Sequence, residues 1–95
     1  MSNINNYPEL SKLNGTIGNV MVEAFNTINN LINDQDISDE EFQDIIIELI
    51  EQKADKASEK KKQEFIKIIK QKRTKQNIAI YIGNFVLKGD GLKVI

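Results

Sequence analysis

A run of basic side chains between residues 58 and 77 is the part of the sequence best suited to bind an anion. Lysines spaced along a helix can each displace counterions from a phosphate backbone, so this segment predicts contact with a nucleic acid or with an acidic protein. The single arginine and the lone aromatic residue of the segment, Phe65, argue against a nucleic acid. The pattern also fits a solvated helix face, or a face paired with acidic residues elsewhere in the chain. The residues concerned are Lys60, Lys61, Lys62, Lys67, Lys70, Lys72, Arg73 and Lys75.

Acidic side chains are concentrated earlier, in the stretch NDQDISDEEFQD at residues 33–44. Such a density of carboxylates can bind Ca²⁺, but Asp39 stands where a calcium loop needs glycine, and Ile45 where it needs a bidentate glutamate. We therefore predict no metal site. Ordered carboxylates can instead occupy a basic groove on a partner protein, as a nucleic-acid backbone would. The candidate acidic interaction face consists of Asp36, Asp39, Glu40, Asp44, Glu48 and Glu51.

The two kinds of charge are separated along the chain. Residues 1–52 contain ten acidic residues and one basic residue, Lys12, which gives this part a net charge of −9. Residues 53–75 have a net charge of +7, although the whole chain of 95 residues sums to −1. A bipolar surface of this kind can steer and orient a partner.

Most catalytic chemistry is excluded by the residue types that the chain lacks. There is no cysteine and no histidine, so disulfides, thiolate metal sites, cysteine nucleophiles and imidazole bases are all ruled out. No hydroxyl nucleophile has a recognisable base beside it, and the stretch NGTIGN lacks the Lys-Ser/Thr ending of a phosphate loop. We expect a protein without catalytic activity and without a cofactor.

The hydrophobic segments are too short to span a bilayer. The longest apolar run, IAIYIGNFVL, is about half the roughly 20 residues that a spanning helix needs, and the N-terminus lacks the pattern of a signal peptide. An amphipathic membrane-surface helix is disfavoured too, because the basic segment has no tryptophan and only a short apolar face. We therefore expect a soluble, cytoplasmic protein that does not bind membranes.

Hydrophobic periodicity predicts two or three amphipathic helices. Apolar residues from Leu10 to Ile32, Phe25 among them, fall on one stripe, which predicts a helix over residues 8–33 that Gly15 and Gly18 would weaken. Ser38 and Glu41 have the spacing of a capping box and begin a second helix, over residues 38–54.

The basic segment predicts a third helix, over residues 58–73. Its apolar face does not continue the face of residues 42–50, and one continuous helix would be about 50 Å long, which exceeds a compact domain of this size. We therefore predict a break around residues 54–58, with Ser58 as the cap of the third helix. The alternative is one long helix in an oligomer.

The remaining residues, 77–95, are rich in β-branched and aromatic side chains. Every second residue from Ile78 through Ile80 to Ile82 is isoleucine, which is the alternation typical of a strand. Gly83-Asn84 and Asp90-Gly91 fit hairpin turns, so the pattern favours a short antiparallel β meander. The same segment also has helical spacing. The sequence thus predicts a single small α+β domain, with two or three amphipathic helices followed by the meander. The alternative is an all-α helical bundle.

These features favour a non-catalytic interaction protein. We expect a small regulator, inhibitor or assembly factor that binds a protein partner and forms a homo-oligomer, dimeric or larger, because the helices are long for the chain and terminal strands would leave open edges. A nucleic-acid-binding accessory protein that uses the basic segment is the alternative. A third hypothesis is a protein that sequesters a small anionic ligand in a pocket between subunits.

Overall fold

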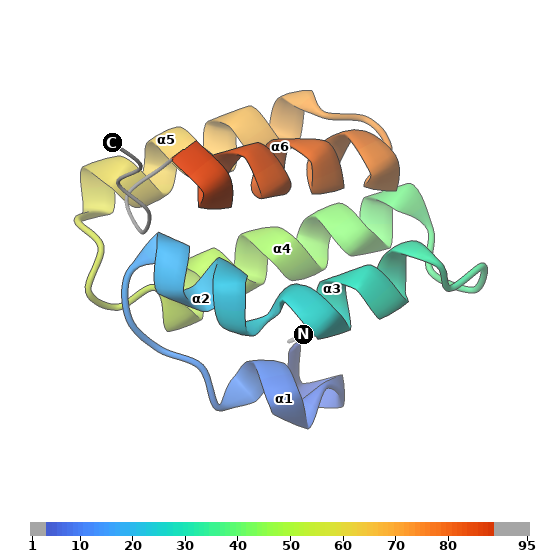
Figure 1. Ribbon diagram of the computed structural model, residues 1–95, viewed down its shortest axis with the longest axis horizontal. Coiled ribbons are helices and arrows are strands. Elements are labelled where there is room, and N and C mark those ends of the chain that lie inside the picture. The colour runs from blue at the N-terminus through green and yellow to red at the C-terminus, as the bar shows by residue number, and fades with distance from the viewer. Residues whose placement is uncertain (1–3, 89–95) are drawn as a thin grey trace.

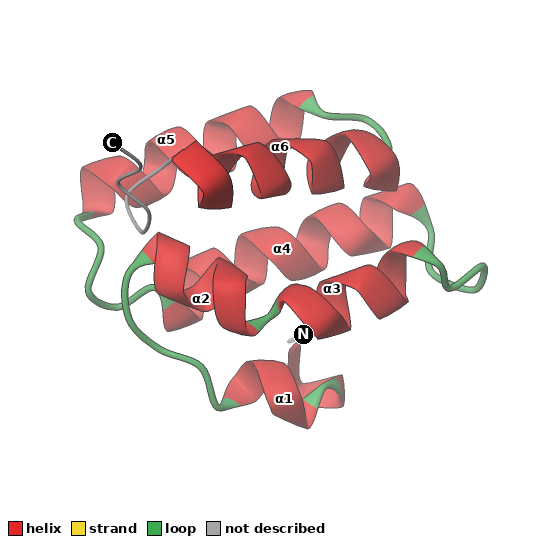
Figure 2. Cartoon of the chain, viewed as in Figure 1, coloured by secondary structure: helices red, strands yellow, loops and turns green. Residues whose placement is uncertain are grey.

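In the computed structural model, which describes residues 4–88, this part of the chain is helical and contains no strand. Helices α2, α3 and α6 form a front layer, and α4 and α5 lie behind it (Figures 1 and 2). Helix α4 is central, because it contacts α2, α5, α6 and the N-terminal turn η1. The elements are η1 (Ile4–Asn6), α1 (Pro8–Ser11), α2 (Ile17–Glu23), α3 (Phe25–Ile32), α4 (Asp39–Lys53), α5 (Glu59–Gln71) and α6 (Lys75–Lys88).

The helix predicted over residues 8–33 is wrong as a single element. The chain leaves helical geometry after α1, and Gly15 has a φ of +123°, which an L side chain rarely adopts. The Gly15 amide donates to Asp55 Oδ1 at 2.9 Å, and the Lys56 amide donates to the Gly15 carbonyl at 2.9 Å. This loop is therefore tied to the connection between α4 and α5, and Thr16 caps a new helix after it.

The connection between α4 and α5 matches the predicted break. Ser38 and Glu41 form the capping box of α4, and Ser58 Oγ accepts a hydrogen bond from the Lys61 amide at the start of α5. The two helices pack against each other, so the alternative of one continuous helix over residues 38–73 is wrong. The Gln43 side chain donates to the carbonyls of Ile69 (3.1 Å) and Lys72 (2.9 Å), and so binds α4 to the end of α5.

The predicted β meander is wrong, because residues 75–88 form helix α6. Thr74 Oγ1 accepts a hydrogen bond from the Asn77 amide and begins this helix. Ile78 and Ile82 are buried on its inner side, and the ring of Phe65 on α5 lies 5.5 Å from Tyr81 and 5.1 Å from Phe85. The all-helical alternative therefore fits and the α+β class does not. Residues 89–95, with the predicted turn at Asp90-Gly91, lie outside the described part.

The core lies where the two layers meet. Phe42, Ile46, Leu49 and Ile50 of α4 are fully buried and pack with apolar side chains from every other α-helix and from η1. Within residues 4–88, none of the helices is both long enough and apolar enough to cross a membrane.

Candidate interaction surface

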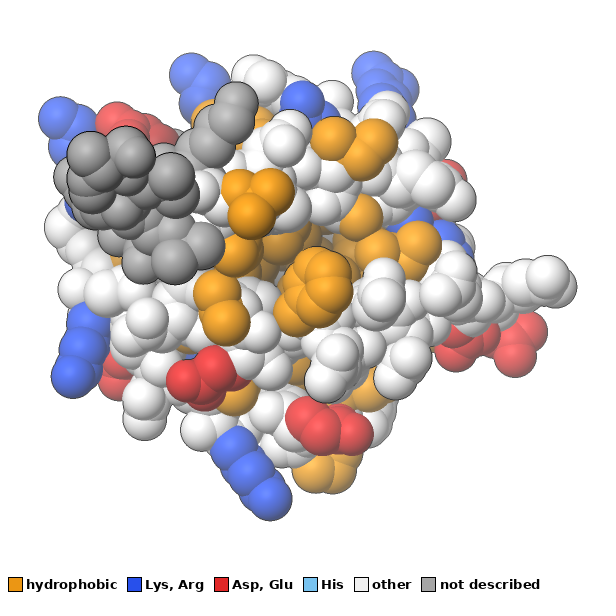
Figure 3. Space-filling model, viewed as in Figure 1, with side chains coloured by type: hydrophobic (Ala, Val, Ile, Leu, Met, Phe, Trp, Pro, Cys, Tyr) orange, Lys and Arg blue, Asp and Glu red, His pale blue; other side chains and the backbone are white. Residues whose placement is uncertain are grey.

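The front layer contains an apolar groove that is open to solvent. It has a volume of about 380 Å³ and is lined by Val22, Phe25, Gly83, Val86 and Leu87; we call these five residues the apolar groove. Val22 and Phe25 are each 50% exposed and Leu87 is 61% exposed. In the space-filling view, apolar side chains gather at the centre of this face, over α2, α3 and α6 (Figure 3).

The groove arises because α6 is apolar on both of its sides. Its inner side buries Ile78 and Ile82, while Ile80 and Leu87 project outward, each 61% exposed. These two residues are seven apart, and therefore two turns apart on the same side of the helix. A helix that is apolar all round is usually buried on all sides. The outer side of α6 is left uncovered by the rest of the described chain.

The groove's opposite wall comes from the junction of α2 and α3. Ala24 separates the two helices and is buried, as are Met21 before it and Ile28 after it. Phe25, which the sequence pattern placed on the buried stripe, is half exposed because the helical path is interrupted at Ala24.

Gly83 forms an open notch in the surface of α6. A Cβ atom added there would meet no other atom within 4 Å. Packing inside the domain therefore does not require glycine at this position. A partner could approach the α6 backbone more closely here than over any other residue type.

The face around the groove has no charged side chains on α3 or on the middle of α6. Helix α3 contains no charged residue, and α6 contains none between Lys75 and Lys88. Charge depletion with exposed aromatic residues is the composition typical of an interface core. The exposed polar residues of these two helices are amides: Asn26, Asn29, Asn30, Gln76, Asn77 and Asn84.

Among the candidate basic residues, Lys62, Lys72 and Lys75 make contacts within the chain, and Lys61 also has a partner there. Lys75 is 8% exposed, and its Nζ donates to the carbonyls of Asp34 (2.9 Å) and Ile37 (2.7 Å). Lys62 Nζ donates to the Glu51 carbonyl at 3.4 Å and lies 3.7 Å from a Glu59 carboxylate oxygen.

The third, Lys72, lies beside an aromatic ring: its Nζ is 5.7 Å from the centre of the Tyr81 ring. These positions give Lys62, Lys72 and Lys75 intramolecular roles.

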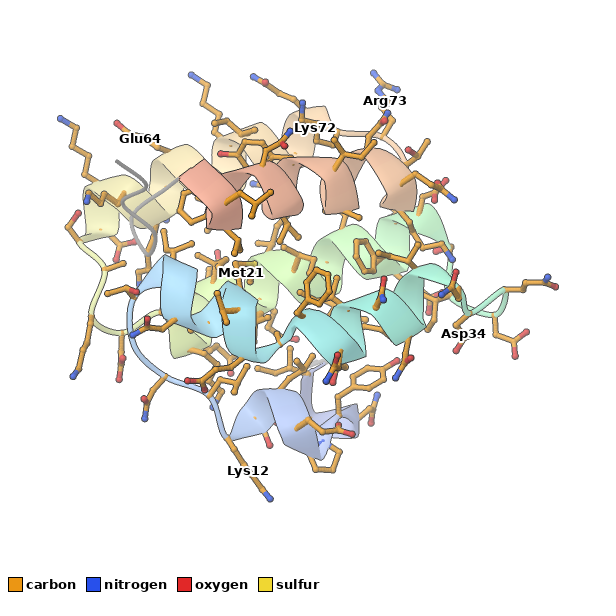
Figure 4. All side chains as sticks on the ribbon, in the orientation of Figure 1. Lys12, Met21, Asp34, Glu64, Lys72 and Arg73 are labelled. Atoms are coloured by element: carbon orange, nitrogen blue, oxygen red, sulfur yellow. The ribbon has the colours of Figure 1, made fainter. Side chains whose placement is uncertain are left out.

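The other five basic residues are exposed. Lys60, Lys61, Lys67 and Lys70 lie on α5, whereas Arg73 lies in the turn before α6. Arg73 extends outward at this turn (Figure 4), whereas the Lys72 ammonium lies near the Tyr81 ring. Lys70, Lys72 and Arg73 line one hollow with Asp39 and Glu40, so the basic end of α5 lies beside the acidic start of α4.

The candidate acidic face is also partly used inside the chain. Glu48 accepts hydrogen bonds from the Ile4 amide (2.9 Å) and the Gln52 side chain (3.2 Å), and Asp39 accepts one from the Lys75 amide (3.0 Å). Five members are exposed: Asp36, Asp39, Glu40, Asp44 and Glu51. No group of acidic side chains among residues 4–88 is arranged to hold a metal ion.

Within the described part of the chain, Tyr81 is the titratable group whose pKa is clearly shifted. It is partly buried against Phe65 and Phe85, and this burial raises the pKa of its hydroxyl above the ordinary value of 10.0. The neutral phenol supplies packing area between α5 and α6.

The sequence pattern did not identify the apolar groove as a site. Its one visible signal was the absence of charge from residues 76–87 in a chain in which 28% of residues are charged. No protein-family model, curated protein or solved structure matches this chain.

Proposed function

We propose that this protein is a non-catalytic protein-binding module that docks on a partner through the apolar groove and Ile80. The observation that carries the proposal is a solvent-open groove of large apolar side chains on a face where α3 and the middle of α6 have no charge. Contiguous exposed apolar surface on a small domain often marks a site of interaction with another protein. A regulator, inhibitor or assembly factor acts in this way, by occupying a partner's surface.

The residues of this face have different roles in the proposed binding. Phe25 and Leu87 present half-exposed apolar anchors on opposite walls, and burial of such anchors supplies most of the affinity of a protein interface. Gly83 lets the partner approach the backbone of α6. The surrounding amides offer donors and acceptors for a polar rim. The charged surfaces of α4 and α5 affect the rate and orientation of encounter more than the affinity.

A nucleic-acid ligand is the second candidate. Lys60, Lys67 and Lys70 are exposed on α5 and lie within one stripe of the helix, which is the arrangement that favours it. Glu64 interrupts this stripe and is exposed as well. A salt titration of binding to labelled DNA and RNA tests this candidate, because three phosphate contacts give a slope of roughly −3 in a plot of log affinity against log salt.

Affinity purification tests the proposed function. The full chain is expressed with an affinity tag beside a copy that carries a different tag, so that both self-association and other partners are detected. Phe25→Asn and Leu87→Asn remove the anchors, and Lys60→Asn and Lys67→Asn are matched controls on α5.

We expect the bound protein to be lost from the anchor variants and retained by the controls, with all four variants folded by circular dichroism. Retention by the anchor variants, or loss from the lysine variants alone, would contradict the proposed function.

A further inference from the structure

We propose that the occupant of the apolar groove is a second copy of this chain. The two copies would meet about a twofold axis that passes beside Gly83 and Asn84, with the α6 helices antiparallel across it. This inference rests on the proposed function and names the partner of the same face. Three properties of the face support it.

The first property is charge. In an isologous interface each residue near the axis faces its own counterpart, so a charged patch would meet like charge. The exposed residues of α3 and of the middle of α6 are apolar or neutral amides, whereas Glu23, Lys72 and Arg73 lie at the edges of this face. The centre of the face can therefore meet itself without repulsion. A symmetric contact through α5 would instead place exposed lysines such as Lys67 and Lys70 opposite one another. Self-association is therefore favoured on the front layer.

The second property is the internal symmetry of the outer side of α6. Ile80 and Leu87 are equally exposed, and the point midway between them falls at Gly83 and Asn84. An antiparallel partner helix centred on that point sets Ile80 of each copy beside Leu87 of the other. The Gly83 notch admits the close approach, and two Asn84 amides at the axis can each donate and accept a hydrogen bond.

The third property is area. Val22 and Phe25 are each 50% exposed, and Ile80 and Leu87 are each 61% exposed. Together they expose on the order of 400 Å² of mostly apolar surface. A stable interface needs about 800 Å² from each partner, with an apolar centre and a polar rim. The apolar side chains supply about half of this area, which is the share expected of an apolar centre, and the exposed amides around them provide a polar rim.

Sedimentation of the full chain over a range of concentrations tests the inference. Asn84→Lys places two positive charges at the axis, and Gln63→Lys is the matched control, because it also puts lysine in place of an exposed neutral amide, on α5 and away from the hollow that Asn84 lines. Both positions are exposed, so both variants should fold. We expect a monomer–dimer equilibrium in the unmodified chain. We also expect Asn84→Lys to raise the dissociation constant at least about tenfold and Gln63→Lys to leave it unchanged.

A monomer at every concentration up to the solubility limit overturns the inference, and so does a dimer that is insensitive to Asn84→Lys. The affinity purification separates this failure from that of the proposed function. If the chain is monomeric but another protein still depends on Phe25 and Leu87 for binding, the proposed function stands and the second copy is not the occupant. If no bound protein depends on these residues, both proposals fail.

Discussion

At the scale of single residues, Lys75 shows how a charged side chain can serve the fold although it lies in a segment that resembles a binding site. Its ammonium is nearly buried and donates to two carbonyls in the loop between α3 and α4, and its amide donates to Asp39. Together these bonds hold the start of α6 against the loop before α4. In the sequence, nothing distinguishes Lys75 from its exposed neighbours.

Replacing Lys75 tests this structural role. Lys75→Met keeps the aliphatic stem but removes both hydrogen bonds from Nζ, and bonds from a charged donor contribute about 1.5–3 kcal/mol each at most. We expect the free energy of unfolding in urea to fall by about 2–3 kcal/mol, whereas Lys67→Met on the exposed side of α5 should change it by less than about 0.5 kcal/mol. Equal effects of the two substitutions would show that Lys75 has no such role.

The buried phenol of Tyr81 gives a pH-dependent signature. Because the folded chain holds this proton more tightly than the unfolded chain, the contribution to stability is full below about pH 10 and is lost as the pH rises through the folded pKa. Ultraviolet titration of a Tyr7→Phe variant, which leaves Tyr81 as the single phenol, should give a midpoint above 10.0. A midpoint at or below that value would contradict the packing of Tyr81 against Phe65 and Phe85.

At the scale of elements, predictability from sequence depends on how local the deciding interactions are. The start of α4 and the break before α5 could be predicted, because Ser38, Glu41 and Ser58 act within one turn of the chain. The helical structure of residues 77–88 could not be predicted in this way. Their β-branched residues favour a strand locally, whereas contacts with α5 and the core stabilise the helix.

The apolar groove could not be predicted either, because it also depends on contacts between distant parts of the chain. Phe25 belongs to the buried stripe of an ideal straight helix, but that helix is interrupted at Gly15 and again at Ala24. The left-handed conformation of Gly15 is fixed by hydrogen bonds to the distant connection between α4 and α5. The absence of charge from residues 76–87 was visible in the sequence, but it fits a buried helix as well as an exposed interface.

Gly83 should affect the stability of the domain and its self-association in opposite directions. Alanine is favoured over glycine inside a helix by about 0.5–1 kcal/mol, and an added Cβ meets no other atom here. We therefore expect Gly83→Ala to raise the free energy of unfolding of the monomer by about that amount while weakening the dimer. Urea unfolding at low protein concentration and sedimentation measure the two effects. A dimer of undiminished affinity would rule out close approach at the notch.

At the scale of the whole molecule, charge is divided between the two layers. The layer of α4 and α5 contains most of the acidic and basic residues, whereas α3 and the middle of α6 have none. Charged surfaces are strongly hydrated and disfavour association, so this division leaves the face of α3 and α6 as the one suited to bind a partner. The near-zero net charge of −1 conceals this arrangement.

This division predicts that self-association depends weakly on salt. Contacts between charged groups lose strength over the range in which the Debye length shortens from about 10 Å to 3 Å, but contacts between neutral groups do not. We expect the dissociation constant of the dimer to change by less than about threefold between 0.1 and 1 M sodium chloride. A steep loss of affinity with salt would instead assign the association to the charged surfaces of α4 and α5.

Site-specific photocrosslinking in living cells tests most directly whether the front layer is the interface. A photoreactive amino acid replaces Ile80 on the outer side of α6 or, in the comparison chain, Lys67 on α5; both positions are exposed. Our account predicts a discrete protein adduct from position 80, with the mass of two chains if the partner is a second copy, and none of comparable yield from position 67. Adducts from position 67 alone would contradict the account and place the interface on the basic surface.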